Sequence, residues 1–300
     1  MGPLLFILYL NDLPELLSSR VRMLADDCVV YRKITSISGS IELQKDIDKL
    51  QNWASKWQME FNPLKCYCMH ITHKKIPLNT SYSLDDHVLE NVTSHTYLGI
   101  HINSKLTWAQ HVNKIATKGN QVLGLIRRNL SSCSPRVKEA AYKSLVLPRL
   151  QYCASIWDPF HKKDLTQLEA VQRRAARFVV GKHSKTHSVS SIITKLGWSA
   201  LEERRMIARL SLLYKSVHHK VAINSDHLRH TPSTRTGMHT RTTETISFLR
   251  DSANKDCFKY SFFPRTTAEW NLLPVSVREA PSLTVFKLNL LTIKNRAHYN

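Results

Sequence analysis

The hydrophobic pattern of the chain changes near residue 109, and this change limits the folds that the chain can adopt. Before it, short apolar runs are separated by turns, with one amphipathic helix predicted over residues 41–57. After it, apolar residues recur at helical spacing, which predicts helices over residues 109–129, 136–147, 164–180 and 199–218. Strand-like segments followed by a run of helices are typical of the α+β class, which is the fold class that we predict.

The basic charge of the chain lies in its second part. The 300 residues carry a formal net charge of +20. Residues 1–110 contain 11 basic and 11 acidic side chains, whereas residues 111–300 contain 32 basic and 12 acidic ones. A polyphosphate backbone is the expected partner of the second part, because each neutralised phosphate releases condensed counterions. The alternative is a basic surface that serves only solubility.

The sequence also bears on the compartment of the protein. The six cysteines form no CxxC pair and are too sparse for a disulfide scaffold, which indicates a reducing environment. The apolar residues 1–10 lack the basic segment of a signal peptide and are followed at once by Asp12 and Glu15. No later run reaches the ~20 apolar residues of a membrane span. We therefore predict an intracellular protein, nuclear or cytoplasmic, that is not secreted and has no membrane partner.

Asp26 and Asp27 stand between two short apolar runs, residues 21–25 and 28–31, which predicts a tight hairpin with both carboxylates at its tip. Adjacent carboxylates repel each other unless a cation or a turn amide compensates them. Carboxylate oxygens are the ligands that Mg²⁺ prefers, and paired metal ions serve phosphoryl transfer. An isolated Asp-Asp pair is more often a solvated turn, so the neighbouring motifs decide between the two interpretations.

Several short motifs follow one another in a characteristic order. They are Gly2-Pro3-Leu4-Leu5-Phe6 with Asn11-Asp12-Leu13, Leu24-Ala25-Asp26-Asp27, Asn62-Pro63-Leu64-Lys65 and Tyr97-Leu98-Gly99-Ile100. In this order they resemble the reverse transcriptases of non-LTR retrotransposons, especially the Jockey and CR1-like group. The similarity continues through residues 145–159, 168–178 and 263–274, so it covers nearly the whole chain.

The resemblance implies an RNA-directed DNA polymerase, a nucleotidyltransferase that takes an RNA template, a DNA primer and deoxynucleoside triphosphates, with Mg²⁺ as its cofactor. It assigns catalytic and metal-binding roles to Asp26 and Asp27. It also places Lys65 near the nucleotide phosphates as a catalytic residue, for which an ordinary surface lysine is the alternative. The turn at residues 97–99, with Tyr97, Leu98 and Gly99, would grip the primer end.

From the resemblance and the composition we expect four parts. These are a truncated reverse-transcriptase palm over residues 1–108, a basic helical thumb and connection region over 109–220, a flexible linker over 221–245 and a small C-terminal module over 246–300. The helix that begins at Gly2 is apolar nearly all round and is expected to be buried.

Whether the chain can catalyse the reaction by itself is a separate question from its resemblance to the family. In the family, another catalytic aspartate comes from a strand upstream of the helix at Gly2, and the chain has no counterpart of that strand. We therefore expect the Asp26-Asp27 hairpin to have an open sheet edge and the polypeptide alone to be catalytically incomplete. The first alternative is a non-catalytic nucleic-acid-binding remnant, and a more remote one is a structural protein with no nucleic-acid partner.

Two arginine clusters are candidates for nucleic-acid binding. Arg173 and Arg177 lie four residues apart on the predicted helix over 164–180, and Arg204 and Arg205, with Arg209, repeat the arrangement on the helix over 199–218. For each cluster alone, a solvated helix face is the alternative. Phosphate binding is favoured because both clusters lie in the part of the chain that carries the excess charge.

Structural roles are assigned to other polar and aromatic groups. Ser199 and Glu202 are expected to form a capping box at the start of the helix over 199–218. Trp53 and Trp57 are interpreted as core residues rather than platforms for stacked bases. Three histidine or cysteine pairs lack a second set at zinc-finger spacing and are interpreted as loop, surface or core residues. These pairs are His183 with His187, His218 with His219, and Cys66 with Cys68.

Overall fold

The computed structural model describes residues 2–76, 78, 80–181, 188–223, 228, 247–249 and 252–297. The chain forms two compact units, one of residues 1–96 and 103–105 and the other of residues 97–102 and 106–300. Most of the linker predicted over 221–245 lies outside the described residues. The finer division of residues 109–300 into a thumb region and a separate C-terminal module stays a prediction.

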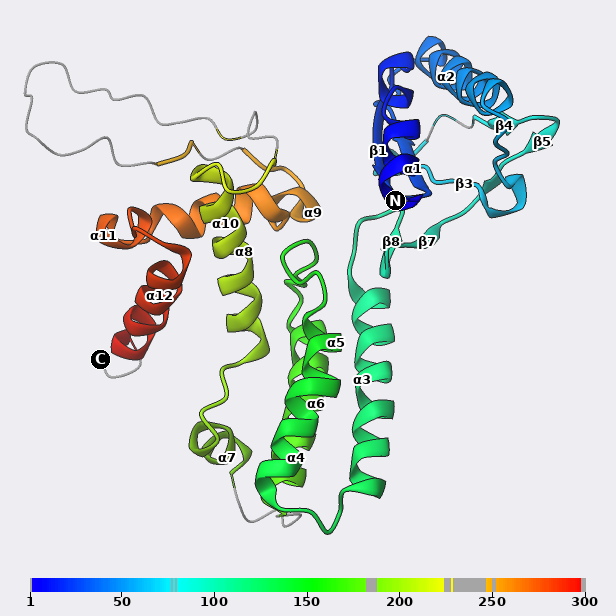
Figure 1. Cartoon of the computed structure of the whole chain (residues 1–300). Helices are drawn as coiled ribbons and strands as arrows, with labels where there is room; N and C mark the ends of the chain where they lie inside the picture. The colour runs from blue at the N-terminus through cyan, green and yellow to red at the C-terminus, as the bar shows by residue number, and fades with distance from the viewer. Residues whose placement is uncertain are drawn as a thin grey trace, which may run out of the picture. The chain divides into compact units, whose positions relative to one another are not determined.

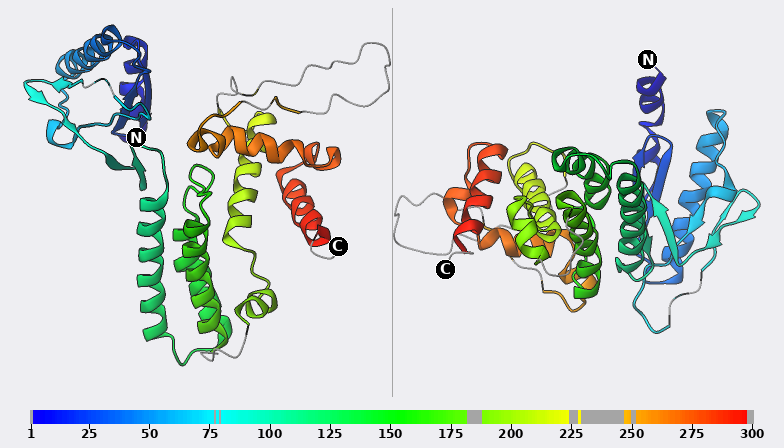
Figure 2. Two further views of the ribbon diagram at one scale, coloured as in Figure 1. Left: turned by 180° about the vertical axis from the view of Figure 1, so that it is seen from behind. Right: turned by 90° about the horizontal axis from the view of Figure 1, so that it is seen from below.

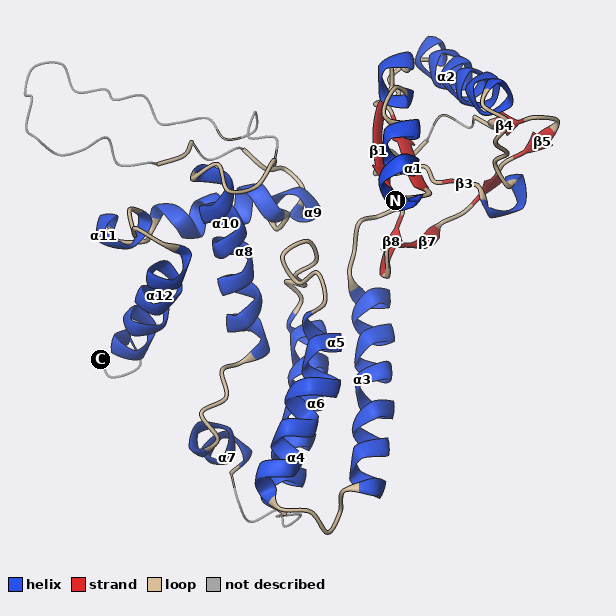
Figure 3. Cartoon of the chain, in the orientation of Figure 1, coloured by secondary structure: helices blue, strands red, loops and turns tan. Residues whose placement is uncertain are grey.

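All strands assigned in the structure lie before residue 104 (Figures 1 and 3). The elements in this part are α1 (Gly2–Leu10), a 3₁₀ turn (Leu13–Leu16), β1 (Arg20–Leu24), β2 (Asp27–Tyr31), α2 (Ile37–Lys56), a second 3₁₀ turn (Pro63–Lys65), β3 (Tyr67–Cys68), β4 (Ser83–Leu84), β5 (His87–Val88), β6 (Glu90–Asn91), β7 (Ser94–Tyr97) and β8 (Ile100–Asn103). With the helices that follow, this content is compatible with the predicted α+β class.

The strands form two-stranded sheets rather than one continuous sheet. β1 pairs with β2, β4 with β5 and β7 with β8, while β3 and β6 form a short parallel pair. Among the described residues, β1 and β2 pair only with each other, so each strand of this hairpin has one edge without a strand partner. This arrangement agrees with the open edge expected from the sequence.

The core of the first unit lies between α2 and the segment that leads into β1. Leu13, Leu50 and Trp53 are buried, and the hairpin packs partly buried side chains against them. Trp53 Nε1 donates to Asp12 Oδ1 at 3.1 Å, which satisfies the indole of this core residue. Trp57 follows the end of α2 and is 37% exposed, so its assignment to the core was wrong.

α1 differs from the sequence-based expectation. We expected this apolar helix to be buried, but Leu4, Leu5, Ile7 and Leu8 are each 59–64% exposed. The end of α1 packs against the core of the unit through Leu10 and through the ring of Tyr9, whose centroid lies 6.2 Å from that of Trp53. The prediction failed because no described element covers the remaining apolar side chains of the helix.

The second unit is built from helices (Figures 1 and 2). They are α3 (Ala109–Asn129), α4 (Pro135–Ala141), a π-helical turn (Tyr142–Val146), α5 (Leu147–Gln151), α6 (Lys162–Val180), α7 (Val189–Lys195), α8 (Leu201–Val217), α9 (Asp256–Lys259), α10 (Phe262–Asn271), α11 (Val275–Arg278) and α12 (Leu283–Ala297). The π-helical turn interrupts the single helix that the sequence predicted over 136–147.

Helices α3, α5 and α6 lie side by side and share a core (Figure 2). Val112, Leu150 and Val171 are fully buried at the places where these helices meet. Gly119 allows the close approach of α3 to α5, because a Cβ at this position would lie 3.0 Å from Leu150 Cδ2. Gly181 ends α6 with φ of +70°, the left-handed C-terminal cap that glycine favours.

α8 begins without the predicted capping box. Ala200 occupies the N-cap position, and no side chain of the helix's own first turn accepts a capping hydrogen bond. Instead, Glu169 of α6 accepts hydrogen bonds from Leu201 N at 2.6 Å and Glu202 N at 3.2 Å. The carboxylate of a neighbouring helix thus satisfies the free amides, which the local sequence could not reveal.

The last helices pack against α8. Tyr214 of α8, Trp270 of α10 and Phe286 of α12 are buried in one cluster, and Tyr214 OH donates to Ala280 O at 2.6 Å. Within the described residues, none of the helices combines the length and the apolar character needed to cross a membrane.

Candidate metal and nucleic-acid sites

The turn between β1 and β2 is a two-residue loop made of Ala25 and Asp26. Leu24 and Asp27 face each other as the last pair of the ladder. Ala25 has φ of +52°, whereas Asp26 does not have a positive φ, which is the pattern of signs of a type II′ turn. Such a turn normally has glycine at its first position, so the Cβ of Ala25 makes the conformation costly. The strained turn holds the two aspartates at the tip of the hairpin, as the sequence predicted.

Both carboxylates at this tip are exposed. Neither Asp26 nor Asp27 makes a hydrogen bond or an ion pair within the described part of the chain. Two unneutralised carboxylates in sequence repel each other, and an oxygen-binding divalent cation would remove that repulsion. The pair therefore fits Mg²⁺ in the kind of donor atom that it offers.

The number of ligands is less favourable. Among the described residues, no group of three or more His, Cys, Asp or Glu side chains is placed to hold a metal ion. Asp26 and Asp27 supply carboxylates from a single turn, which is too few to fix two metal ions. The hairpin therefore fits part of a metal site.

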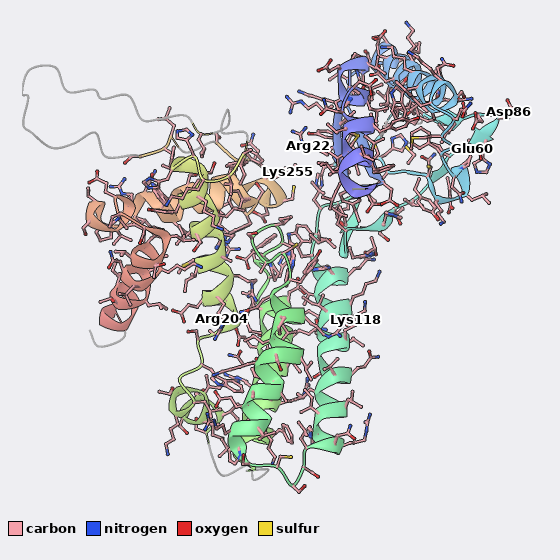
Figure 4. All side chains as sticks on the ribbon, viewed as in Figure 1. Arg22, Glu60, Asp86, Lys118, Arg204 and Lys255 are labelled. Atoms are coloured by element: carbon pink, nitrogen blue, oxygen red, sulfur yellow. The ribbon has the colours of Figure 1, made fainter. Side chains whose placement is uncertain are left out.

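A second pair of exposed aspartates lies on another hairpin turn. Asp85 and Asp86 connect β4 to β5, and Asp85 also has a positive φ, of +52° (Figure 4 labels Asp86). Asp85 differs because Gln51 of α2 donates to its carboxylate and accepts from its backbone N–H. Turn geometry alone therefore does not distinguish a metal site, but the Asp26-Asp27 pair has no such partner.

The segment that carries Lys65 lies close to the hairpin. Burial and, to a lesser degree, the nearby Cys66 thiol raise the pKa of Cys28 to about 11. Cys28 follows Asp27 and Cys66 follows Lys65. The interaction between the two thiols therefore indicates that the two candidate catalytic segments lie near each other. Lys65 is exposed and makes no ion pair among the described residues.

Asn62 shapes the turn before Lys65. Its Oδ1 accepts a hydrogen bond from Leu64 N at 3.1 Å, and Pro63 opens the short 3₁₀ turn. This capping contact gives Asn62 a structural role at the turn.

The loop between β7 and β8 contains Leu98 and Gly99, both with positive φ, of +47° and +79°. This is the sign pattern of a type I′ hairpin turn. Tyr152, beyond the end of α5, donates from its hydroxyl to Leu98 O at 3.1 Å, and a Cβ at Gly99 would lie 3.3 Å from Tyr152 Cε1. Gly99 and Tyr152 also line a cavity of about 450 Å³ that reaches Arg149. The structure thus places part of the predicted primer-gripping turn, Leu98 and Gly99, beside a basic side chain.

The arginine clusters differ in exposure. On α6, Arg173 is exposed and Arg177 is half-buried, and Arg204 of α8 is also half-buried (Figure 4). Arg205 is 0% exposed, and its Nε donates to Asp158 Oδ1 at 2.7 Å. The assignment of Arg205 to nucleic-acid binding was wrong, because a buried guanidinium paired with a carboxylate cannot reach a phosphate in solvent.

Asp158 was not singled out from the sequence. Its buried carboxylate accepts hydrogen bonds from Arg205 and Arg209 and forms an ion pair with Arg265. The only local signal is a carboxylate directly after the apolar run that ends at Trp157. Sequence reasoning also passed over Arg127, Arg128 and Lys138, which line a cavity of about 550 Å³ in the second unit.

The cysteine and histidine pairs form no group of three or more metal-ligand side chains within the part of the chain that the structure describes. Burial raises the pKa of both Cys66 and Cys68. His218 packs against Tyr214 with ring centroids 4.1 Å apart. His183 and His187 lie outside the described residues.

Comparison with known proteins gives one family match and several relatives. Residues 1–102 match the family model described as "Reverse transcriptase (RNA-dependent DNA polymerase)". Two relatives come from Drosophila melanogaster. The chain is 25% identical over 190 residues to the "Probable RNA-directed DNA polymerase from transposon X-element" and 27% identical over 195 residues to the "RNA-directed DNA polymerase from mobile element jockey" of this species.

Each of these alignments covers 60% of this chain and 21% of the relative, so the chain spans about a fifth of the length of the curated relatives that it matches. The "Probable RNA-directed DNA polymerase from transposon BS" of the same species is 26% identical over 192 residues, with the same coverage. No solved structure is significantly similar to the chain. The matched segment contains the Asp26-Asp27 hairpin, Lys65 and the turn at residues 97–99.

Proposed function

Because residues 1–102 carry a reverse-transcriptase sequence and the chain resembles the polymerases of Jockey-like retrotransposons, we propose that it forms part of an RNA-directed DNA polymerase. Asp26 and Asp27 hold a divalent cation in this proposal, with Mg²⁺ as the expected ion. The observation that carries it is the position of two exposed carboxylates without a partner on a strained hairpin turn, within the segment that matches the family.

The residues of the first unit have distinct parts in this function. Asp26 and Asp27 supply carboxylate oxygens. Mg²⁺ bound in such a site favours attack by a primer 3′-hydroxyl and stabilises the charge of leaving pyrophosphate. Lys65 carries an exposed positive charge on the neighbouring segment and is suited to approach the phosphates of a deoxynucleoside triphosphate.

The second unit supplies the nucleic-acid contacts in this proposal. Arg173 and Arg177 of α6, together with Arg204 of α8, contact phosphates of the RNA template or the DNA primer. The turn formed by Tyr97, Leu98 and Gly99 contacts the primer end, and Tyr152 fixes its shape through the Leu98 carbonyl. The net charge of residues 111–300 supports this assignment, since phosphate binding rewards a basic surface.

Residues 1–300 by themselves are expected to extend primers poorly. Two carboxylates from one turn leave the coordination of two metal ions incomplete, and no third ligand lies near them in the described residues. Primer extension on an RNA template with Mg²⁺ measures this directly. Incorporation close to background is expected, and robust incorporation that Asp26→Asn abolishes would show that residues 1–300 form a complete site.

A chimaera tests the polymerase assignment itself. Residues 1–102 replace the matching segment of the jockey polymerase, and incorporation of deoxynucleotides on an RNA template is measured. We expect activity that Asp26→Asn removes. The matched control is the double change Asp85→Asn and Asp86→Asn, which removes the other aspartate pair and should leave the activity in place.

Binding of the chimaera to a primer and template is measured as a check that the chimaera is folded. A chimaera that binds them and remains active after Asp26→Asn would contradict the assigned role of the hairpin. The charge distribution also supports a second candidate function, the binding of nucleic acid without catalysis. In that case residues 111–300 would bind nucleic acid, while the bound chimaera would show no incorporation.

A further inference from the structure

A cavity of about 550 Å³ in the second unit is lined by three cationic side chains. Arg127 and Arg128 come from the last turn of α3 and Lys138 from α4, while Phe178 and Gly181 belong to the C-terminal end of α6. None of these residues belongs to the sites assigned above.

Lys138 is the unusual member of this set. Only 9% of the residue is exposed, and its Nζ lies 5.3 Å from the centroid of the Phe178 ring. Among the described residues it forms no ion pair. A lysine side chain that is largely buried against an aromatic ring is only partly compensated, because a cation–π contact supplies no counter-charge.

The neighbouring carboxylate is already occupied. Glu139 lies next to Lys138 in sequence, but it accepts from Lys143 Nζ at 2.6 Å and from Trp198 Nε1 at 2.9 Å. The hydrogen bond from Lys143, followed by the one from Trp198, lowers the pKa of Glu139. Glu139 therefore stays ionised in another ion pair.

The two arginines add charge at the rim of the cavity. Arg127 and Arg128 are exposed and make no ion pair among the described residues. A Cβ added at Gly124 would lie 3.7 Å from Arg128 Nη1, so the guanidinium reaches back over the glycine toward the cavity. Cations also complement the dipole of a helix C-terminus, but this effect does not account for the burial of Lys138.

We propose that this cavity binds a phosphate group of a polynucleotide strand, with Lys138 at its base and Arg127 and Arg128 at its rim. Guanidinium groups donate two parallel hydrogen bonds to phosphate, and the volume admits a phosphate with its sugar. A polynucleotide is preferred over a free anion because Gly181 of the cavity lies one helical turn after Arg177 of the proposed phosphate-contacting face, on the same side of α6. This inference rests on the proposed binding of nucleic acid by the second unit.

The test uses residues 1–300 and a fluorescent single-stranded oligonucleotide. Its affinity is measured by anisotropy over a range of sodium chloride concentrations. The double change Arg127→Gln and Arg128→Gln should lower the slope of log affinity against log salt by about 1, which corresponds to roughly tenfold weaker binding at about 0.1 M salt. Lys138→Met, which retains most of the contact with Phe178, should also weaken binding.

The control removes the same charge from the other end of α6. Lys162 and Lys163 are exposed and unpaired among the described residues, and both are changed to glutamine. Equal losses of affinity in this control and in the Arg127 and Arg128 variant would overturn the proposal, because net charge alone would then explain the effect. Arg127 and Arg128 both lie on the surface, so their replacement should leave the unfolding midpoint unchanged, and this midpoint serves as the check of folding.

The phosphate in the cavity could belong to a polynucleotide or be a free anion. Competition with inorganic phosphate at constant ionic strength distinguishes these two ligands. Weak competition by inorganic phosphate, together with strong binding of the oligonucleotide, supports the polynucleotide. Binding of inorganic phosphate without binding of the oligonucleotide would overturn it. If the wild-type chain bound the oligonucleotide but the Arg127 and Arg128 variant behaved as the control did, this site would fail while the proposed nucleic-acid binding stood.

Discussion

Arg205 and Asp158 form a buried ion pair, with Arg205 Nε 2.7 Å from Asp158 Oδ1. Arg209 Nε lies 2.9 Å from the other carboxylate oxygen of Asp158, and Arg265 Nη1 lies 3.1 Å from it. One carboxylate thus neutralises arginines from α8 and α10, which ties the C-terminal helices to the segment that follows α5. The arginine pattern of α8 therefore serves packing at two of its three positions.

Removal of this carboxylate should destabilise the second unit. Asp158→Asn leaves the buried guanidinium of Arg205 without its counter-charge and that of Arg209 with Glu269 alone, and the expected loss is about 3–5 kcal/mol in the free energy of unfolding. Urea unfolding followed by circular dichroism measures it. Glu42→Gln is the control, because its ion pair with Lys45 is exposed and should change stability by less than about 1 kcal/mol. Similar midpoints for the two variants would contradict the role of Asp158.

Two glycines should respond in opposite ways to alanine. Gly99 has φ of +79°, and a Cβ there would lie 3.3 Å from Tyr152 Cε1, so Gly99→Ala should cost about 1–2 kcal/mol. Gly39 lies in α2, where a Cβ would meet Ile34 at an ordinary 3.7 Å. Gly39→Ala should therefore stabilise the chain by about 0.5–1 kcal/mol. Denaturant unfolding compares the two, and a stabilising effect of Gly99→Ala would show that the turn is not strained for alanine.

Asp46 should contribute stability that depends on pH. Burial acts to raise its pKa, but hydrogen bonds from Ser19 and Ser18 outweigh burial and hold the pKa well below its usual range. A lowered pKa in the folded state means that this stability is fully present above the unfolded pKa of about 3.9 and is lost as pH falls toward the folded value. Asp46→Asn should cost about 2–3 kcal/mol near neutral pH.

The same variant should lose stability less steeply than the wild type below about pH 4. The control is Asp48→Asn, an exposed position two residues away on α2. Unfolding by urea at several pH values provides the comparison. Parallel pH profiles for wild type and Asp46→Asn would contradict the assigned hydrogen bonds.

Arg173 and Arg177 should contribute to the salt dependence of nucleic-acid binding. Changing both to glutamine removes two cations from the exposed side of α6 and should lower the slope of log affinity against log salt by about 1–2. The control is the change of Lys162 and Lys163 to glutamine on the same helix. Anisotropy with an RNA–DNA hybrid measures both, and identical slopes for the two variants would exclude a phosphate-contacting face on α6.

Local sequence signals predicted the elements better than their surroundings. The apolar runs around Asp26 and Asp27 predicted the hairpin, and helical spacing predicted α3 at the bounds that the structure has. The burial of Arg205 depends on Asp158, 47 residues away, and no local pattern encodes such a pairing. The cap of α8 was missed for the same reason, because it comes from Glu169 on another helix.

At the candidate site too, the sequence predicted the local element but not its detailed conformation or surroundings. Sequence placed Asp26 and Asp27 at a turn, but it did not indicate that Ala25 would take a positive φ or that Asp85 and Asp86 would form a similar tip. The exposure of α1 was also unexpected, since an apolar helix is normally covered and its composition does not say by what. Motif order therefore contributed more to the proposed function than the geometry of the hairpin alone.

The most direct test of the central claim is the binding of Mn²⁺, a paramagnetic substitute for Mg²⁺, to residues 1–300 by electron paramagnetic resonance. We predict weak binding, with a Kd of about 10⁻³ M, that the double change Asp26→Asn and Asp27→Asn removes. The matched change of Asp85 and Asp86 to asparagine should leave that binding intact. Equal Mn²⁺ binding by the wild type and by the Asp26 and Asp27 variant would contradict the claim that this hairpin holds the metal.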